Sequence, residues 1–483
     1  PSCQNQTYKT NTFKNKNRPT HTPFKLDRNQ TVNRTKDQFK LQGIKKNLLA
    51  FFRHLQTQTP IMSQPNNNQN LSTFMNSGFY YFKGSNTVFI DPVRVLNQSY
   101  TQFTVTPSSY YSRFFEPNLQ TDEHLIISEH KRKRKRKEKK VRELNEREQA
   151  ADQRHQRVKP LLMKAHECLL EADDLLLNLG KLRIDDCGTF EPKSTVESDE
   201  QSFVELGSVW QAPLFEIALH INQDHRLTQD CTFVQNCEKR NVPAFGSLVA
   251  NETNSDMEAD FLNRRYIIPK RSSFYMSDLK QIHGLIPGKH ECGFNLIVID
   301  PPWENGSANQ KLKYPTLPNR YFLSLPIQRL AHADGALVAL WVTNKEKLRI
   351  FVEKDLFPKW GVKYMATHYW LKVKADGSLI SELDLFHHRP YECLILGYYY
   401  GKDEDSEHLS QLKSIPDCQV YISIPGDYSR KPPVGEILHE YIPGLEPARC
   451  LELFARELLG GWTSWGNEPL RFQDSRYFTR KHQ

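Results

Sequence analysis

A series of short apolar runs over the C-terminal part of the chain is the strongest constraint on the fold. The first run, FNLIVID at 294–300, is almost wholly apolar, and others follow at 335–343, 363–373, 392–400, 420–425, 449–455 and 461–467. Amphipathic segments with helical spacing separate several of them, at 318–332, 345–361 and 433–443. Strands that are buried on both faces read as continuous apolar runs. The pattern therefore predicts a mostly parallel sheet with helices on both faces, an α/β sandwich of the Rossmann type.

The first apolar run ends at the residues DPPW, 300–303. Asp300 follows the strand at its carboxyl end, where open α/β sheets bind ligands. Pro301 and Pro302 lack backbone donors and have fixed φ angles, which predicts a rigid loop whose carbonyl groups point outward as acceptors. A carboxylate from Asp300 and a flat wall from Trp303 suit a planar group with an amine, such as adenine. The alternative is a turn that ends a strand and buries its tryptophan.

The loop also suggests a reaction. The exocyclic amine of adenine is a poor nucleophile because its lone pair is delocalised into the ring. Acceptors on Asp300 and the Pro301 carbonyl would keep that lone pair available and aim it at an electrophilic carbon. A sulfonium methyl group is such a carbon and requires neither a metal nor a strong base, so we expect metal-free methyl transfer to adenine.

Further motifs follow in order: LKYPTLPN, LWVTN, HRPYECLILGYY, SRKPPVGEI and CLELFARELLGGWTSWGNE. With them, roughly residues 270–475 resemble the adenine-N6 methyltransferases that include the catalytic subunit of the messenger-RNA m6A writer. The resemblance implies a Rossmann-like methyltransferase fold in permuted order, in which the catalytic loop precedes the cofactor-binding strand. It also implies S-adenosyl-L-methionine as the methyl donor and S-adenosyl-L-homocysteine as the product.

The resemblance assigns roles to individual residues. The catalytic loop is formed by Asp300, Pro301, Pro302 and Trp303. Substrate contacts are expected from Tyr314, His388, Arg389 and Glu392. Cofactor contacts are expected from Ser273, Phe274, Asp278, Asp300, Lys431, Phe454, Arg456, Asn467 and Glu468. The messenger-RNA writer has glutamine at the position of Glu468. A surface position for His388 and a solvated position for Lys431 are the alternatives.

Positive charge is concentrated outside this region. The net charge is +9, yet residues 291–483 hold 23 basic and 24 acidic residues, whereas residues 1–61 carry +10 and residues 131–140 carry +8. Because binding to a phosphate backbone requires several Lys or Arg contacts, we expect affinity for nucleic acid to come from the N-terminal half, or from an RNA read by its shape. The basic run is typical of a nuclear localisation signal, with a nucleic-acid arm or a solvated linker as alternatives. Its core is Lys131, Arg132, Lys133, Arg134, Lys135, Arg136 and Lys137. We expect a nuclear protein, with a cytoplasmic pool as a second expectation.

Five regions are expected along the chain. Residues 1–61 lack periodic apolar residues and precede the first methionine, Met62, which predicts a disordered basic tail or an upstream extension. Residues 62–125 predict a small β-containing module, and residues 126–190 the basic run and an amphipathic helix. The apolar stripe of that helix predicts packing on a domain or, alternatively, a coiled coil: Leu162, Ala165, Leu169, Ala172, Leu176 and Leu179. Residues 191–269 form a middle region without clear periodicity, and residues 270–483 the methyltransferase domain.

Composition excludes some classes of protein. No window approaches the roughly 18 apolar residues of a membrane helix. The nine cysteines are dispersed, and the neighbours Cys231 and Cys237 lack the spacing of a zinc site, so we expect reduced thiols in an intracellular protein.

The choice of substrate rests on the resemblance. Chemistry on the adenine amine requires an unpaired or flipped base. The branch of the family that the chain resembles acts on 2′-O-methyladenosine in U2 small nuclear RNA, giving m6Am, and DNA adenine is the alternative. A catalytically silent scaffold that binds RNA or a partner is a third hypothesis, against which the chain retains Asp300, Trp303, Lys431 and Asn467. We expect a monomer, with a partner methyltransferase as the alternative.

Overall fold

The computed structural model describes part of the chain: residues 67–111, 145–184, 202–222, 237–289, 292–304, 316–385, 388–401, 413–427, 430–444 and 447–481. All of them belong to one compact unit, Pro65–Gln483. The basic tail at 1–61 and the basic run at 131–140 lie outside the described residues. No helix in the described ranges is long and apolar enough to cross a membrane.

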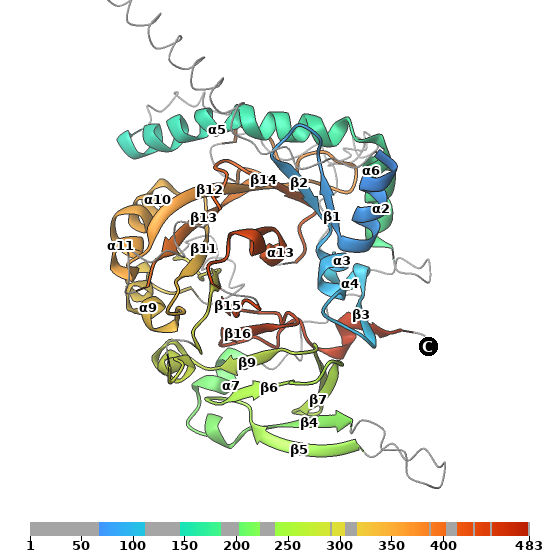
Figure 1. The fold of residues 1–483 in the computed structure, drawn as a ribbon, viewed down its shortest axis with the longest axis vertical. Helices are drawn as coiled ribbons and strands as arrows, with labels where there is room; N and C mark the ends of the chain where they lie inside the picture. The colour runs from blue at the N-terminus through green and yellow to red at the C-terminus, as the bar shows by residue number, and fades with distance from the viewer. Residues whose placement is uncertain are drawn as a thin grey trace, which may run out of the picture. The chain divides into compact units, whose positions relative to one another are not determined.

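An eleven-stranded mixed sheet forms the centre of this unit (Figure 1). Its strands, in spatial order, are β1 (Phe79–Tyr81), β2 (Thr87–Ile90), β14 (Val420–Ser423), β12 (Lys363–Lys372), β13 (Tyr391–Tyr399), β11 (Ala336–Val342), β10 (Leu296–Ile299), β15 (Cys450–Leu453), β16 (Trp462–Gly466), β9 (Ser273–Met276) and β6 (Leu248–Ala250). Strand β10 pairs in parallel with β11 and β15, and β16 pairs in parallel with β15 and β9. Strand β13 is antiparallel to both β11 and β12, so β12 runs in the same direction as β10. The predicted Rossmann-like α/β sheet is confirmed. Strand β10, which leads into the DPPW loop, precedes β15 and β16 in the chain.

Successive residues of β10 enter two different cores, which explains its uninterrupted apolar sequence. Ile297 and Ile299 pack in a cluster with residues of the helical segments α9 (Ile327–Leu330), α10 (Glu346–Phe351), η8 (Val352–Leu356) and α11 (Phe357–Trp360). Leu296 and Val298 pack on the opposite face with residues of α13 (Gly435–Leu438). Helices α9, α10 and α11 lie together at one side of the sheet (Figure 1). Both faces are therefore covered, as the sequence predicted.

The N-terminal segment joins the main sheet, which the sequence did not indicate. Strand β2 pairs in parallel with β14, and β3 (Phe103–Val105) pairs antiparallel with β17 (Phe478–Arg480). Helices α2 (Asn67–Ser77), α3 (Pro92–Asn97) and α4 (Pro107–Tyr110) accompany these strands. In the described part of the expected module at 62–125, β1 and β2 thus extend the central sheet, whereas β3 forms a separate two-stranded sheet with β17.

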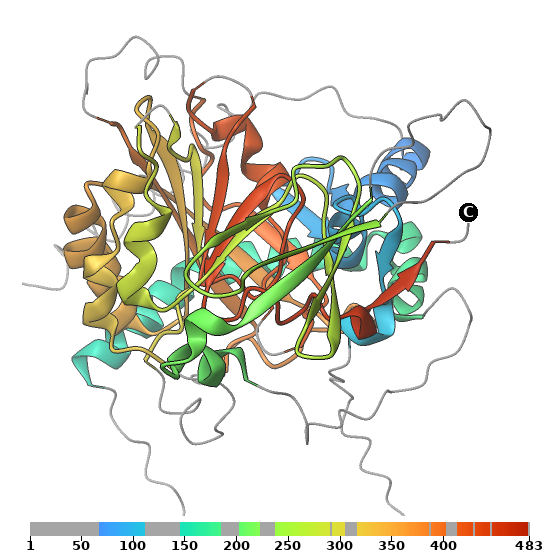
Figure 2. The same ribbon diagram turned by 90° about the horizontal axis from the view of Figure 1, so that it is seen from below.

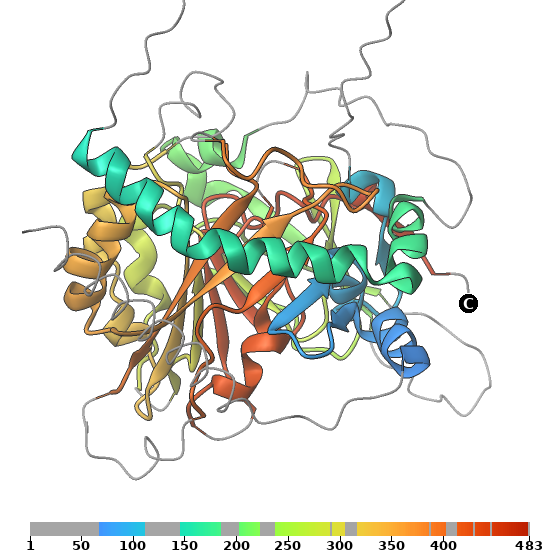
Figure 3. The ribbon, with the colours of Figure 1, turned by 90° about the horizontal axis from the view of Figure 1, so that it is seen from above.

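The long helix α5 (Glu146–Leu170) runs across β12, β14 and β2 (Figure 3). It begins with a capping box, in which Asn145 accepts a hydrogen bond from the Glu148 backbone and Glu148 accepts one from the Asn145 backbone. Its buried residues Leu162, Ala165 and Leu169 belong to the same hydrophobic cluster as strand residues of β12 and β14. The apolar stripe therefore packs on the domain. Helices α6 (Asp173–Leu179) and η2 (Gly180–Arg183) follow it.

The middle region forms a second, four-stranded antiparallel sheet. Its order is β5 (Cys237–Pro243), β4 (Glu216–Asn222), β7 (Met257–Phe261) and β8 (Arg264–Ile268), with α7 (Phe203–Ser208) and η4 (Ala212–Leu214) before it. A turn with positive φ at Leu262 and Asn263 joins β7 to β8. Figure 2 shows this sheet, in green, and Figure 1 places it beyond β9 and β6. One hydrophobic cluster joins it to β9 through Phe274.

Candidate active site

Two motifs that are far apart in the sequence meet at the carboxyl end of β10. Asp300 follows that strand directly, between β11 and β15. The ammonium group of Lys431 lies 3.0 Å from Oδ1 and 3.1 Å from Oδ2 of Asp300, so it contacts both carboxylate oxygens. The two side chains are largely buried, with 11% of Lys431 and 20% of Asp300 exposed. Lys431 is therefore an integral part of the site rather than a solvated lysine.

Glu392 extends this ion pair along the strand ends. It lies at the start of β13, and its Oε2 is 3.5 Å from Nζ of Lys431. Its Oε1 forms a second ion pair with Lys372, the last residue of β12. Burial alone would raise the pKa of Glu392, but the two ammonium groups outweigh it and lower the pKa to about 2. Burial lowers the pKa of Lys431, and Asp300 and Glu392 reverse this effect and raise it.

Trp303 anchors the catalytic loop. Its indole Nε1 donates a hydrogen bond to the Trp341 carbonyl at 2.8 Å, and its ring meets that of Phe322 edge to face at 5.1 Å. The side chain is buried in the core below the loop. Within the described residues, Trp303 thus holds the loop in place. This corresponds to the alternative hypothesis for the motif, a turn that ends a strand and buries its tryptophan.

The loop carbonyls differ from the expectation of free acceptors. The Pro301 carbonyl accepts a hydrogen bond from the Trp303 backbone at 2.7 Å, and the Pro302 carbonyl accepts one from the Leu317 backbone at 3.0 Å. Proline has no backbone N–H group, but the N–H groups of later residues can still donate hydrogen bonds to its carbonyl. A carbonyl oxygen has two lone pairs, so each can still accept a second hydrogen bond.

Four expected cofactor residues follow β15 and β16 at the same edge of the sheet. Phe454 has a positive φ of 64° directly after β15, and its ring packs against Phe322 and Trp465. Arg456 lies over the ring of Phe472. Asn467 and Glu468 follow β16, where Glu468 pairs with Arg471 at 3.3 Å. Because β10, β15 and β16 are parallel neighbours, the structure brings these residues to the edge that holds Asp300.

Glu452 is a site residue that the motifs did not assign. It lies on β15, opposite Val298 of β10 and Ser464 of β16. Burial raises its pKa to about 8, and the carboxylates of Glu457 and Asp300 add to this shift. A charged residue inside the apolar run CLELF was the signal that could have indicated it.

The three residues expected from β9 divide between the two ends of the strand. Ser273 begins β9 and bonds to Thr463 Oγ1 at 2.9 Å, at the end opposite to Asp300. Phe274 is fully buried in the cluster shared with the middle region. Their positions do not bring them to the site, because the first half of a parallel strand lies at the opposite edge of the sheet. Asp278 follows the carboxyl end of β9 and caps η5 (Leu279–Leu285), accepting from the backbones of Lys280 and Gln281.

The expected substrate residues next to β13 are held by α5. Arg389 is almost fully buried and lies 3.4 Å from Asp152 and from the Ala151 carbonyl. His388 has a positive φ of 65°, and its carbonyl accepts a hydrogen bond from Ser381 Oγ. Tyr314 lies outside the described residues. The structure therefore places Arg389 against a helix rather than at an open entrance.

Helix α5 also contacts Tyr391 at the start of β13 and two described residues between β12 and β13. His155 bonds to the Tyr391 hydroxyl at 3.1 Å and stacks on its ring. Lys159 pairs with Asp384 at 2.7 Å, and His166 bonds to the Gly377 carbonyl at 2.8 Å. This segment leads directly into Glu392, so a helix from the N-terminal half supports one wall of the site.

A second N-terminal contact supports the segment before Lys431. The guanidinium of Arg430 lies between the rings of Tyr110 and Phe472, 4.1 and 4.2 Å from their centroids. It also pairs with Glu457, with 3.0 Å between Nε and Oε2. Tyr110 belongs to α4, so residues from both ends of the chain fix the position from which Lys431 extends.

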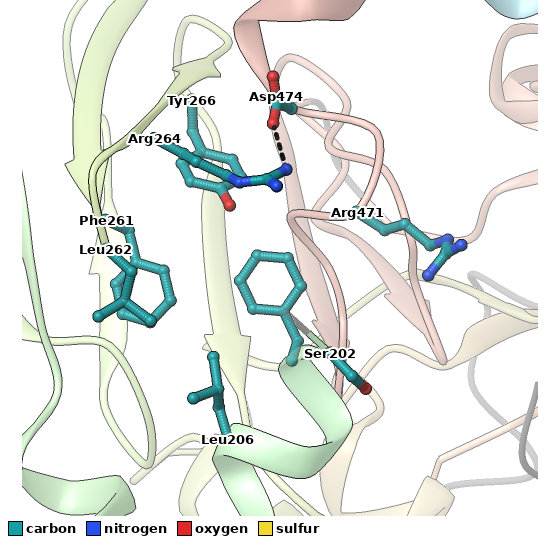
Figure 4. A pocket seen from close by; sticks show the side chains of 9 residues that line it. Ser202, Leu206, Phe261, Leu262, Arg264, Tyr266, Arg471 and Asp474 are labelled. Carbon is teal, nitrogen blue, oxygen red and sulfur yellow. Dashed lines mark hydrogen bonds and ion pairs between the residues drawn. The ribbon is translucent and has the colours of Figure 1, made fainter. Parts of the chain in front are cut away.

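A pocket is lined by residues other than Asp300, Lys431 and Glu392 (Figure 4). Aromatic and aliphatic side chains of α7, β7 and β8 form much of its wall, with Phe203, Leu206, Phe261 and Tyr266 among them. Its two arginines are both engaged, because Arg264 pairs with Asp474 at 3.4 Å and Arg471 pairs with Glu468. Neither Asp300 nor Lys431 lines it, and the ion pair of Arg471 with Glu468 connects its wall to the expected cofactor residues. Across the described ranges, no group of three or more His, Cys, Asp or Glu residues is arranged to hold a metal ion.

Comparison with known proteins agrees with the motifs. Residues 294–468 match the sequence model of the MT-A70 family. The N(6)-adenine-specific methyltransferase METTL4 of Mus musculus is 39% identical over 237 residues, which are 48% of this chain and 49% of that protein. The N6-methyladenosine RNA methyltransferase MTA1 of Pyricularia oryzae is 31% identical over 232 residues, 46% of this chain and 59% of that protein.

A relative with a different named substrate also matches. The DNA N6-methyl methyltransferase of Caenorhabditis elegans is 34% identical over 221 residues, 45% of this chain and 56% of that protein. The chain spans about half the length of the curated relatives it matches. The predicted resemblance is confirmed: residues 294–468, the region that holds the site, match the MT-A70 family, and the relatives are named as N6-adenine or N6-methyladenosine methyltransferases.

Proposed function

We propose that this chain is an S-adenosylmethionine-dependent N6-adenosine methyltransferase that acts on RNA, with 2′-O-methyladenosine in U2 small nuclear RNA as its target. The observation that carries the proposal is the contact of Lys431 with both oxygens of Asp300 at the carboxyl end of β10. It joins the DPPW loop to the SRKPP motif within the MT-A70 region. The likeness to METTL4 supports the choice of branch.

The side chains at this edge fit S-adenosylmethionine, the cofactor of MT-A70 methyltransferases. Bound there, the cofactor would supply the electrophilic methyl group. The ammonium group of Lys431 suits a carboxylate, and the carboxyl groups of Glu468 and Glu452 suit ribose hydroxyls. Glu452 lies on β15 and Glu468 follows β16, and Lys431 contacts Asp300 at the end of the neighbouring β10.

The chain's own residues position the amine. The carboxylate of Asp300 would accept a hydrogen bond from the adenine amine and keep its lone pair directed at the methyl carbon. Lys431 fixes that carboxylate in one orientation, and Trp303 fixes the loop that presents it. The proton that the amine gives up after the transfer would leave through Asp300 to solvent.

A transfer experiment tests the reaction and the substrate together. Tritiated methyl transfer would be measured on four matched oligonucleotides: RNA with adenosine, the same RNA with 2′-O-methyladenosine, single-stranded DNA and duplex DNA. We expect the highest kcat/KM on the 2′-O-methylated RNA. Preference for either DNA would overturn the RNA assignment and retain the chemistry. Absence of transfer to all four would overturn the proposal and favour a scaffold or an enzyme that requires a partner chain.

DNA is the second candidate substrate, because one relative is named for it. Competition between equal amounts of the 2′-O-methylated RNA and single-stranded DNA separates the candidates, since the true substrate should suppress labelling of the other.

We also propose that the chain carries a complete site as a monomer. The support comes from within the chain: α5 contacts Tyr391 next to Glu392, and Tyr110 contacts Arg430 next to Lys431. Sedimentation of the active fraction checks this: activity should co-migrate with a single copy of the chain. Activity found only in a larger species would contradict it.

The basic run at 131–140 is proposed as a nuclear localisation signal. Deleting it should reduce nuclear accumulation of a fluorescent fusion several-fold while leaving the melting temperature within about 2 °C, because a run of nine Lys and Arg and one Glu contains no apolar side chain to contribute to a core. A matched control replaces its nine Lys and Arg by Gln, which keeps the length and removes the charge. An unchanged distribution in both variants would leave the linker and nucleic-acid arm hypotheses.

A further inference from the structure

The charges of the site extend to one residue that neither the motifs nor the comparisons assign. Lys372 ends β12, and its ammonium group forms an ion pair with Glu392. It also lies 4.3 Å from the centroid of the Trp370 ring, a distance suited to a cation–π contact. Only 14% of the side chain is exposed. The Lys372 backbone donates a hydrogen bond to the Pro390 carbonyl at 2.8 Å, so the residue is held on a rigid strand end.

With Lys372, the site contains a row of four charges that alternate in sign. Asp300 contacts Lys431 at 3.0 Å, Lys431 contacts Glu392 at 3.5 Å, and Glu392 contacts Lys372. Three strand ends, those of β10, β12 and β13, supply three of these residues. The row is arranged so that each inner charge has an opposite charge on both sides.

The distances show how Lys431 is shared between two carboxylates. It is closer to Asp300 than to Glu392, and it contacts both oxygens of Asp300. A free Glu392 carboxylate would compete for the same ammonium group, because opposite charges attract strongly in a partly buried site. Lys431 lies near Oε2 of Glu392, whereas Lys372 forms an ion pair with Oε1. Its ion pair therefore reduces the competition and leaves Lys431 with Asp300.

We propose that Lys372 is a positioning residue, which holds Glu392 so that Lys431 fixes the Asp300 carboxylate in the orientation that receives the adenine amine. The inference rests on the proposed function, in which Asp300 contacts that amine. A direct contact between Lys372 and the phosphate backbone is the competing role. The small exposed fraction and the ion pair with Glu392 argue against it, since a phosphate contact requires an accessible charge.

The test compares variants of the full-length chain on RNA that carries 2′-O-methyladenosine. Lys372→Met should lower kcat about 10- to 100-fold, because small displacements of a positioned group cost this much, with a smaller change in KM for RNA. Lys372→Arg, which keeps the charge, should recover most of the loss. Lys363→Met is the matched control, since Lys363 begins the same strand at the opposite edge and lies over the ring of Tyr400. It should leave kcat unchanged.

A double-mutant cycle identifies the route of the effect. If Lys372 acts through Glu392, then Lys372→Met should change kcat less than about twofold in the Glu392→Gln background. An equal loss in both backgrounds would overturn the proposal. So would a loss that appears as a rise in KM for RNA that steepens with salt, because that is the behaviour of a phosphate contact.

Crystal structures of the wild type and Lys372→Met give a measurement that requires no turnover. The ammonium group of Lys431 should move from Asp300 towards Glu392 in the variant. An unchanged contact between Lys431 and Asp300 would overturn the inference. A wild-type chain that transfers no methyl group would instead overturn the proposed function, and the crystallographic comparison would still decide the role of Lys372.

Discussion

Replacing Asp300 by Ala should lower kcat for methyl transfer by about 10²- to 10³-fold, the loss typical of removing one positioned hydrogen-bonding group from an active site. The amine would lose its acceptor, and Lys431 would turn to Glu392, which already lies 3.5 Å away. Asp300→Asn should fall between the wild type and Asp300→Ala, because its amide keeps one acceptor oxygen but loses the charge that holds Lys431. Single-turnover kinetics with saturating cofactor measures this step directly.

The control for this prediction is an aspartate at the opposite edge of the sheet. Asp334 precedes β11 and is partly exposed, so Asp334→Ala should retain wild-type kcat. Calorimetric titration of S-adenosylhomocysteine separates chemistry from binding, and Asp300→Ala should change the Kd less than about tenfold. Substantial turnover in Asp300→Ala would contradict the assignment of the loop. Trp303→Ala is a less specific probe, since Trp303 is also buried in the core.

The central strands could be predicted from the sequence because their environment is simple. Residues of β10 and β11 are buried on both faces, so almost every position is apolar and the run is visible without its neighbours. The pairing of β2 with β14 has no such signal. Nothing in the sequence around residues 87–90 specifies a partner more than 300 residues away, and only the completed sheet supplies it.

The middle region was unclear because β5, the edge strand of its sheet, is exposed on both faces. In β5, Glu238, Lys239 and Arg240 are consecutive exposed charges, which conceal the strand from a search for apolar periodicity. The turn between β7 and β8 uses Leu262 and Asn263 in the left-handed region, and leucine is a rare residue there. Local preference therefore disagreed with the tertiary structure at this position.

Site residues that stand in a sequence motif could be predicted. Site residues that are identified only by their position in the fold could not. Asp300 and Lys431 were found because they stand in distinctive motifs, although their contact spans 131 positions in the chain. Lys372 was missed because a lysine at the end of a strand is ordinary in any sequence. Ser273 and Phe274 were assigned to the cofactor by likeness alone, and the direction of β9 places Ser273 at the other edge of the sheet.

Replacing Glu457 by Gln should lower the free energy of unfolding by about 3 kcal/mol, because it removes one partner of a buried ion pair and leaves the other charged. The Arg430 side chain is 4% exposed and that of Glu457 is 14% exposed. Burial lowers the pKa of Arg430, but Glu457 reverses this effect and keeps the guanidinium charged. The rings of Tyr110 and Phe472 contribute attraction to that charge, but they cannot replace a carboxylate.

Urea denaturation followed by circular dichroism measures this loss, and an exposed ion pair provides the control. Lys413 and Glu440 lie 3.2 Å apart with 66% and 43% of their side chains exposed, so Glu440→Gln should cost less than about 1 kcal/mol. Equal losses in the two variants would contradict the view that burial of Arg430 sets the cost. A larger loss of unfolding free energy in Glu457→Gln is the expected result. It would show that the Arg430–Glu457 pair stabilises the position next to Lys431, where Tyr110 contacts Arg430.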